Sequence, residues 1–200
     1  MSQLNLVFNK GVLNTTRNNQ RIIYDFQKLG KIVEHCKGLG LQIVLTQGTF
    51  DMVHVGHGRY LSEAKKHGDI LIVGVDSDEK VKKRKGPERP VVPHTERLEM
   101  LTHLRPVDLV VLKELHHPKW HLIKTVRPDI LIATKETYTK EKIKALEKYC
   151  GKVVVLEPMA TTTTSAKIRL MQINAAKKVG HALTPKLIAT IEEVLREIKD

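Results

Sequence analysis

The 200-residue sequence is poor in aromatic residues, in cysteine and in long apolar runs. Aromatic residues make up only 4% of it, so a core must be built mainly from Leu, Ile and Val. Two cysteines, Cys36 and Cys150, are too few and too far apart for a disulfide scaffold or a zinc site. No apolar run approaches the roughly 18 residues of a membrane span, and no basic stretch followed by an apolar one opens the sequence. We therefore expect a cytoplasmic protein without a membrane partner.

Positive charge is what the sequence has in excess. There are 34 Lys and Arg residues against 22 Asp and Glu, a formal net charge of +12. Such an excess predicts an anionic ligand, but nucleic acid, a membrane surface and a phosphorylated metabolite all fit, as does a face of solvated lysines. A composition of 41% hydrophobic and 28% charged residues is typical of a globular protein, and the length favours one domain with appendages.

Short β-branched apolar runs alternate with segments of helical periodicity from residue 41 onward. The apolar runs are residues 41–46, 69–75, 108–112, 129–134 and 151–157. Their nearly continuous Val, Ile and Leu content suits strands that are buried on both faces. The pattern predicts an α/β fold, namely a doubly wound, Rossmann-like, five-stranded parallel sheet with added N- and C-terminal helices. Ligands of such sheets bind beyond the carboxyl ends of the strands, so site residues should follow strands.

The two ends of the sequence are predicted to be helical. Residues 1–40 form an N-terminal extension with one amphipathic helix, whose apolar stripe is Ile22, Ile23, Phe26, Leu29, Ile32 and Val33. Residues 41–180 form the main domain, whose last helix spans 165–179 and stops at Gly180. Residues 181–200 contain a separate C-terminal helix from Thr184 to Lys199. These end helices are candidates for an accessory layer or for the contact of a homodimer.

A motif with two histidines, an aspartate and two glycines follows the first predicted strand. Residues 48–57 read GTFDMVHVGH and run into a helical pattern. His54 and His57 straddle the helix start, where unpaired backbone N–H groups and imidazole donors can converge on one anion. Gly56 lacks a Cβ atom, so a phosphate or a ribose can approach the backbone there. Incidental histidines and a zinc pair are the alternatives, although no third zinc ligand lies nearby in the sequence.

This segment resembles the (G)xFDxxHxGH signature of the cytidylyltransferase-like nucleotidyltransferases. The resemblance extends over about residues 41–170, and the stretch KGPERPVVPHTERLEML at 85–101 is most similar to the sugar-phosphate adenylyltransferase domain that forms ADP-heptose. It implies transfer of a nucleotidyl group from an NTP to a phosphate monoester such as a sugar 1-phosphate, with release of pyrophosphate. Glycerol-3-phosphate cytidylyltransferases and archaeal-type FAD synthetases, which adenylylate FMN, are close relatives and stay as alternatives.

The resemblance also implies roles for particular residues. The catalytic set is His54, His57, Lys82 and Arg97. The nucleotide-binding set is Gly48, Thr49, Phe50, Asp51, Gly56, Lys85, Thr163, Thr164 and Ser165. Mg²⁺ is expected to accompany the NTP, and no residue is assigned as a metal ligand. Because the attacking phosphate is already anionic, catalysis needs positioning and charge neutralisation, and it needs no general base.

Several of these residues have a structural interpretation as well. Asp51 can hold its own loop through backbone N–H groups or contact the ligand. The basic run at 80–86 (KVKKRKG) is interpreted as a mobile phosphate-binding loop in which Lys83 and Arg84 are merely solvated; a solvated face, a nucleic-acid patch and a localisation signal are the alternatives. The hydroxyls at 163–165 can cap a helix or face the phosphates.

Two departures from the family pattern bear on the substrates. Relatives often carry a Gly-Asp pair after the fourth strand, where this sequence reads TKETY at 134–138. The arginine that cytidylyltransferases carry before the hydroxyl-rich segment is absent, since EPMA stands at 157–160, and this favours ATP over CTP. We expect an NTP and a phosphorylated small molecule as partners, and no nucleic acid. A nucleotide- or RNA-binding protein that has lost turnover is the alternative from another class.

Overall fold

A computed structural model describes residues 18–134, 138–157, 159 and 164–197. The chain divides into two compact units, Met1–Ala160 and Thr161–Asp200, which are described separately. Within the described residues, every helix is either too short or too polar to cross a membrane.

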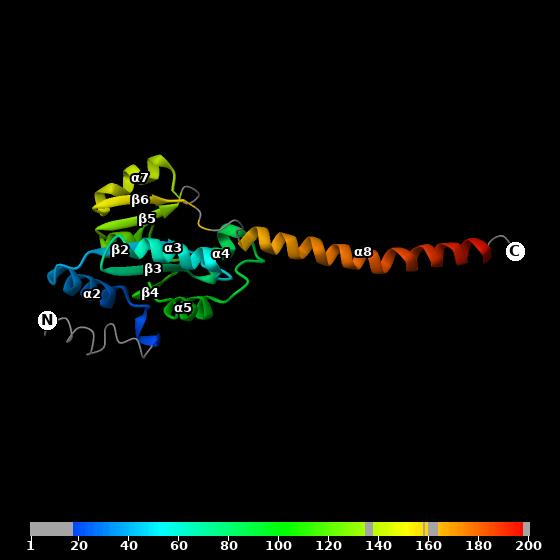
Figure 1. The fold of residues 1–200 in the computed structure, drawn as a ribbon, viewed down its shortest axis with the longest axis horizontal. Helices are drawn as coiled ribbons and strands as arrows, with labels where there is room; N and C mark the ends of the chain where they lie inside the picture. Colours follow the sequence, from blue (N-terminus) through cyan, green and yellow to red (C-terminus); the bar gives the residue numbers. More distant parts are fainter. Residues whose placement is uncertain (1–17, 135–137, 158, 160–163, 198–200) are drawn as a thin grey trace. The chain divides into compact units, whose positions relative to one another are not determined.

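The first unit is a parallel α/β sheet with helices on both faces (Figure 1). Its elements in chain order are η1 (Asn18–Arg21), β1 (Ile22–Ile23), α2 (Phe26–Gly38), β2 (Ile43–Gly48), α3 (Val55–Lys65), β3 (Ile70–Asp76), α4 (Asp78–Lys85), α5 (His94–Thr102), β4 (Leu109–Lys113), α6 (His121–Val126), β5 (Ile130–Thr134), α7 (Lys140–Leu146), η2 (Glu147–Tyr149) and β6 (Lys152–Leu156). The strand order is β1-β4-β3-β2-β5-β6, and every neighbouring pair is parallel. The chain leaves β2 in one direction toward β3 and later returns to its other side with β5, so the crevice of this doubly wound sheet lies beside the end of β2.

The predicted doubly wound sheet is confirmed, with one difference at its edge. The sheet has a sixth strand, because Ile22 and Ile23 pair with Val110 and Val111 of β4 and do not belong to the N-terminal helix. Helix α2 begins only at Phe26, after Asp25 accepts a hydrogen bond from the Gln27 amide at 2.7 Å. A β-branched pair next to a buried strand gains more from sheet pairing than from a helical turn, which explains the change.

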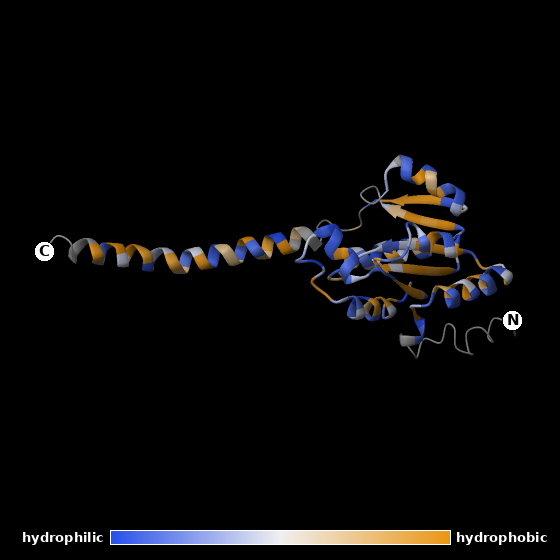
Figure 2. Ribbon diagram, turned by 180° about the vertical axis from the view of Figure 1, so that it is seen from behind, coloured by the Kyte–Doolittle hydropathy of each residue, from blue (hydrophilic) through white to orange (hydrophobic). Residues whose placement is uncertain are grey.

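Alternating residues of the strands serve two separate cores. Helices α2, α6 and α7 cover one face, where the strands contribute Ile43, Leu45, Ile70, Ile72, Leu109, Val111 and Leu131. Helices α3 and α5 cover the other face, where the strands contribute Val44, Leu71, Val73, Val75, Val110, Leu112 and Ile132. Figure 2 shows the strands as an apolar interior between more polar helices. Burial on both faces fixes the register of the central strands and with it the positions of the residues at their carboxyl ends.

Two glycines of this unit give a matched prediction on stability. A Cβ atom on Gly151 would lie 2.7 Å from the Asp129 carbonyl oxygen, which is backbone and cannot swing away. Gly30 is inside α2, and a Cβ atom there would meet nothing within 4 Å. We expect Gly151→Ala to lower the free energy of unfolding by about 1–3 kcal/mol. Gly30→Ala should raise it by about 0.5–1 kcal/mol, and urea unfolding of both variants would check the pair.

The described residues of the second unit, 164–197, form one helix, α8 (Thr164–Glu197). The predicted helix end at Gly180, with a new helix starting at Thr184, is wrong, because α8 runs through both Gly180 and Pro185. Pro185 removes one backbone donor, and the Thr184 hydroxyl donates to the Gly180 carbonyl at 2.8 Å in the same turn. The backbone hydrogen bonds of the other turns keep this helix of 34 residues continuous through Pro185.

Candidate active site

The motif turn between β2 and α3 has a strained backbone. Phe50 and Met52 have positive φ angles, 52° and 51°, which are uncommon for residues other than glycine. Gly48 permits this turn, because a Cβ atom there would lie 2.9 Å from the Phe50 ring. Strained backbone of this kind persists only where its surroundings hold it, and it is concentrated at functional sites. The turn carries Thr49 and Phe50, both of which are buried, to the end of the central strand.

His54 and His57 form a reciprocal cap at the start of α3. The His54 Nδ1 accepts from the Gly56 amide at 3.1 Å, and the His57 Nδ1 accepts from the His54 amide at 3.3 Å. The ring centroids are 4.2 Å apart. Because both Nδ1 atoms accept, the neutral rings carry their hydrogen on Nε2, which is therefore a donor on each ring. The cap fixes the tautomer and the orientation of both imidazoles, and it occupies the Gly56 amide that sequence reasoning assigned to the anion.

Asp51 holds the segment that precedes α5. Its carboxylate accepts from the Val91 amide at 3.1 Å and from the Val92 amide at 3.0 Å, and it pairs with Arg89 at 2.7 Å. Only 3% of Asp51 is exposed. The structure therefore shows the loop-holding role, while contact of Asp51 with a ligand stays a prediction.

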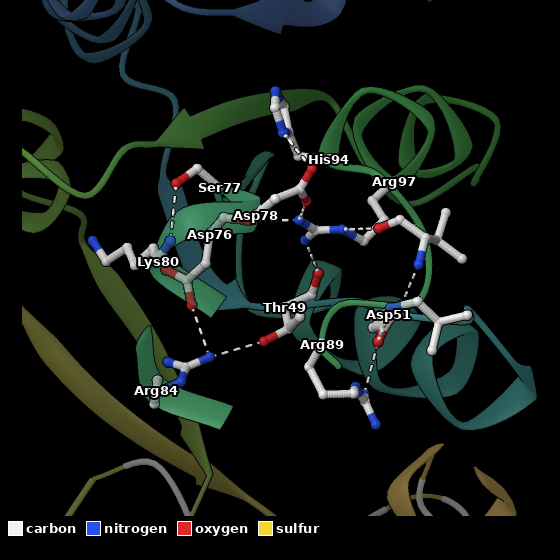
Figure 3. Close-up of polar contacts among 12 residues, drawn as sticks. Thr49, Asp51, Asp76, Ser77, Asp78, Lys80, Arg84, Arg89, His94 and Arg97 are labelled. Carbon is white, nitrogen blue, oxygen red and sulfur yellow. Dashed lines mark hydrogen bonds and ion pairs between the residues drawn. The ribbon is translucent and has the colours of Figure 1, made fainter. Parts of the chain in front are cut away.

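Arg97 is a buried crosslink under the same turn (Figure 3). It is 1% exposed, and its guanidinium donates to the Thr49 carbonyl, to the Asp76 carbonyl at 2.9 Å and to Asp78 at 2.7 Å. Its Nε donates to the Val92 carbonyl at 2.9 Å. One side chain thus joins the end of β2, the end of β3 and the segment before α5. These contacts make Arg97 a positioning residue, while its contact with phosphates stays a prediction.

The basic run at 80–86 is helical, so the predicted mobile loop is wrong. Residues 78–85 form α4, and the Ser77 hydroxyl caps it by accepting from the Lys80 amide at 3.3 Å. Helical spacing places Lys80, Arg84 and Lys85 beside one cavity, whereas Lys82 is exposed and does not line it. The predicted contact of Lys82 with phosphate stays a prediction.

Arg84 is not merely solvated as the sequence suggested. Its Nη2 donates to the Thr49 hydroxyl at 2.8 Å and lies 2.9 Å from an oxygen of Asp76 (Figure 3). Lys113, at the end of β4, contacts the other Asp76 oxygen at 2.9 Å. Burial alone would raise the pKa of Asp76, but Lys113 and Arg84 outweigh it and hold that pKa below its ordinary value. Burial lowers the pKa of Lys113. The attraction of Asp76 raises it again, but by less, so the pKa stays below its ordinary value. The carboxylate therefore stays charged at neutral pH and fixes two cations.

A cationic cavity of about 800 Å³ lies at the carboxyl ends of β2, β3 and β4. Residues of the strand ends that line it are Gln47, Gly48, Thr49, Asp76 and Lys113. Among the described residues that line it, the cationic side chains are Lys80, Arg84, Lys85, Lys113, Lys119 and Lys142, and the carboxylate is Asp76. This imbalance attracts anions, and a ligand with several negative charges would be held best. Partial burial and the neighbouring cations Arg84 and Arg89 lower the pKa of Lys85.

The remaining wall of this cavity was not foreseen from the sequence. Tyr138 accepts from the Gln47 side-chain amide at 3.1 Å, and burial raises the pKa of Tyr138 to about 12, so it is a neutral donor. Phe26 of the N-terminal helix stacks on His121 and meets His117 edge-on, at 4.5 and 4.6 Å between ring centroids. Lys113 could have been found, because it directly follows a predicted strand. Tyr138 and Phe26 could not, because only the fold brings them to this edge.

Part of the predicted nucleotide-binding set lies beyond what the structure describes. Thr163 lies outside the described residues, as do residues 135–137 of the divergent segment after β5. Thr164 and Ser165 open α8 in the second unit, where the description is limited to their backbone. The roles of these hydroxyls toward phosphate stay predictions.

The first unit thus combines a Rossmann-like sheet, an HxGH-type turn at its central strand and a cationic cavity beside that turn. The family model described as cytidylyltransferase-like matches residues 45–173, and the chain belongs to this family. Among curated relatives, the bifunctional protein HldE of a Nitratiruptor species is 38% identical over 151 residues, 75% of this chain and 32% of the relative. The HldE protein of Sulfurimonas denitrificans is 44% identical over 110 residues, 55% of this chain and 23% of the relative. The chain thus spans about a third or less of these relatives' length.

Two solved structures are similar to this chain. The lipopolysaccharide core biosynthesis protein from Thermoplasma volcanium aligns with a TM-score of 0.52 and 29% identity, over 60% of this chain and 100% of that one. Pantoate-beta-alanine ligase from Francisella tularensis aligns with a TM-score of 0.54 over 72% of this chain and 68% of that one. At 15% identity, the second likeness concerns the fold alone.

Proposed function

We propose that the chain transfers AMP from ATP to a sugar 1-phosphate and releases pyrophosphate. The observation that carries the proposal is the HxGH-type turn at the end of β2, next to a cavity whose described lining has six cationic side chains and one carboxylate. The similarity to HldE proteins and to a lipopolysaccharide core biosynthesis protein supports a sugar phosphate as the acceptor class.

The reaction requires little of the protein beyond positioning of the two substrates and neutralisation of their negative charge. An acceptor phosphate oxygen attacks the α-phosphorus of the NTP, a new P–O bond forms, and the bond from the α-phosphorus to the bridging oxygen of pyrophosphate breaks. The acceptor is already anionic, so no protein base takes a proton. The Nε2–H groups of His54 and His57 would donate to the triphosphate where negative charge grows, and the cations of the cavity would neutralise the phosphates.

Mg²⁺ fits this scheme as a companion of the NTP. The described residues hold no group of three His, Cys, Asp or Glu side chains placed to bind a metal. Asp51 and Asp76 are each engaged by cations of the protein. Mg²⁺ commonly keeps several waters and takes substrate phosphates as ligands, so we infer that it enters with the triphosphate and supplies further positive charge there.

The test is turnover by the full chain with ATP or CTP against three acceptors. Heptose 1-phosphate, glycerol 3-phosphate and FMN would each be supplied with Mg²⁺, with pyrophosphate and product mass as readouts. We expect pyrophosphate from ATP with the sugar phosphate. Turnover only with CTP and glycerol 3-phosphate, or only with FMN, would replace the proposed substrates. Absence of turnover together with steeply salt-dependent RNA binding would favour the non-enzymatic alternative.

Lys85 and Lys83 provide a matched pair for the cavity. Both side chains are exposed, but Lys85 lines the cavity and its neighbour Lys83 does not. We expect Lys85→Ala to raise the KM of a phosphorylated substrate about 10-fold, the loss of one charge-assisted hydrogen bond of about 1.5 kcal/mol. Lys83→Ala removes the same charge and should leave KM within about 2-fold, since water and salt screen an exposed charge that does not line the cavity. Equal effects of the two variants would mean that net charge alone matters.

A further inference from the structure

Among the described residues of the second unit, none outside helix α8 packs against the apolar side of that helix. Apolar residues recur three and four positions apart along it, and we call the set Ile173, Ala176, Val179, Leu183, Leu187, Ile191 and Val194 the α8 stripe. Its larger members are 43–62% exposed. Figure 2 shows apolar and polar segments alternating along the helix. Most of the stability of such a helix comes from packing its apolar face, so the α8 stripe requires a partner surface.

The charges of the α8 sequence indicate what that partner is. Residues 164–181 contain four Lys and Arg residues and no Asp or Glu, a charge of +4. Residues 182–197 contain two Lys and Arg residues and three Glu, so 2 − 3 gives −1. Two parallel α8 helices would place +4 against +4, whereas two antiparallel ones place +4 against −1 at both ends. The charge pattern therefore matches a second copy of the same helix in the opposite direction.

The small residues of α8 support the same arrangement. If the twofold axis passes between Leu183 and Thr184, position numbers that face each other add up to 367. Ala176 then faces Ile191, and Gly180 faces Leu187, so a small residue meets a large one. A Cβ atom on Gly180 would meet nothing within 4 Å, so a large partner side chain can approach the helix backbone there, as interdigitated helices need.

We propose that a second copy of this chain covers the α8 stripe by antiparallel pairing of the two α8 helices. An anionic membrane surface is the competing partner for an amphipathic helix with lysines. It fits less well, because membrane-surface helices carry Lys and Arg along the whole polar face, and the second half of α8 is net negative.

The first test is the oligomeric state of the full chain by sedimentation and light scattering. The wild type should be a dimer at micromolar concentration. Leu183→Glu/Leu187→Glu places two charges in the α8 stripe and should weaken the dimer at least 100-fold. Ala182→Glu/Ala189→Glu adds the same charges on the opposite side of the helix and should leave the dimer intact. A monomeric wild type, a monomer that binds anionic vesicles, or equal effects of the two variants would each overturn the proposal.

The second test distinguishes the direction of pairing by disulfide trapping under mild oxidation. In the antiparallel pair, position 173 faces position 194, and the two copies of position 173 are about 31 Å apart, given 1.5 Å per helical residue. Ile173→Cys/Val194→Cys should therefore give covalent dimers, and Ile173→Cys alone should behave as the wild type with its native cysteines. Covalent dimers of the single variant would show parallel pairing and overturn the proposal. Turnover is read separately, so this result is independent of the proposed reaction.

Discussion

Arg97→Met should lower the free energy of unfolding by about 3–5 kcal/mol, the cost of removing one partner from a buried polar network. The guanidinium is 1% exposed and donates to three carbonyls and to Asp78. Methionine fills similar volume but donates nothing, so the carbonyls of Thr49, Asp76 and Val92 lose this buried donor. Each such loss is expensive because water cannot replace it.

Urea unfolding followed by circular dichroism would measure this loss, with Arg105→Met as the matched control. Arg105 is exposed, so its replacement should change stability by less than about 0.5 kcal/mol. Arg97→Lys separates charge from geometry, since one ammonium group cannot span acceptors on three segments. We expect the lysine variant to recover little of the stability. If Arg97→Met cost as little as Arg105→Met, the network would not hold the turn.

The fold was predictable where one signal dominated. Continuous Val, Ile and Leu runs indicated five buried strands, and the observed strands lie within two residues of the expected bounds at each end. The edge strand β1 was missed because its two residues, Ile22 and Ile23, fit a helical stripe equally well. Their pairing with β4 becomes visible only in the folded structure. The prediction for α8 failed for a related reason, since Gly180 and Pro185 are local stop signals that a long helix overrides.

The residues of the candidate site likewise separate into those that the sequence could predict and those that it could not. His54 and Asp51 belong to one short motif, so the sequence alone places them at the same turn, and their roles toward a ligand stay predictions. Arg84 was predicted to be solvated because a run of cations does not show which side chains face the protein. Helix α4 turns Arg84 toward Asp76. Tyr138 was missed because its partner Gln47 is 91 positions away. Local chemistry can thus be predicted from the sequence, whereas contacts between strand ends depend on strand order.

The largest effect on turnover is expected at the histidine pair. In the proposed reaction each imidazole donates through Nε2 to charge that grows in the transition state, and loss of one such donor costs about 10²–10³ in kcat. The pair also caps α3, so an alanine variant would lose the cap and the donor together. Substitution by alanine alone therefore cannot distinguish a role in turnover from a role in folding.

His54→Asn and His57→Gln make that distinction. Asparagine is among the best N-cap residues, and glutamine at the third helical position can reach back to the cap amide, so both variants should keep the free energy of unfolding within about 1 kcal/mol of wild type. Neither supplies an imidazole, so kcat should still fall about 10²–10³-fold. His35→Asn, on the exposed surface of α2, is the control for histidine loss elsewhere. Steady-state turnover and urea unfolding of the same preparations would decide, since wild-type kcat in both capped variants would reduce the pair to a structural cap.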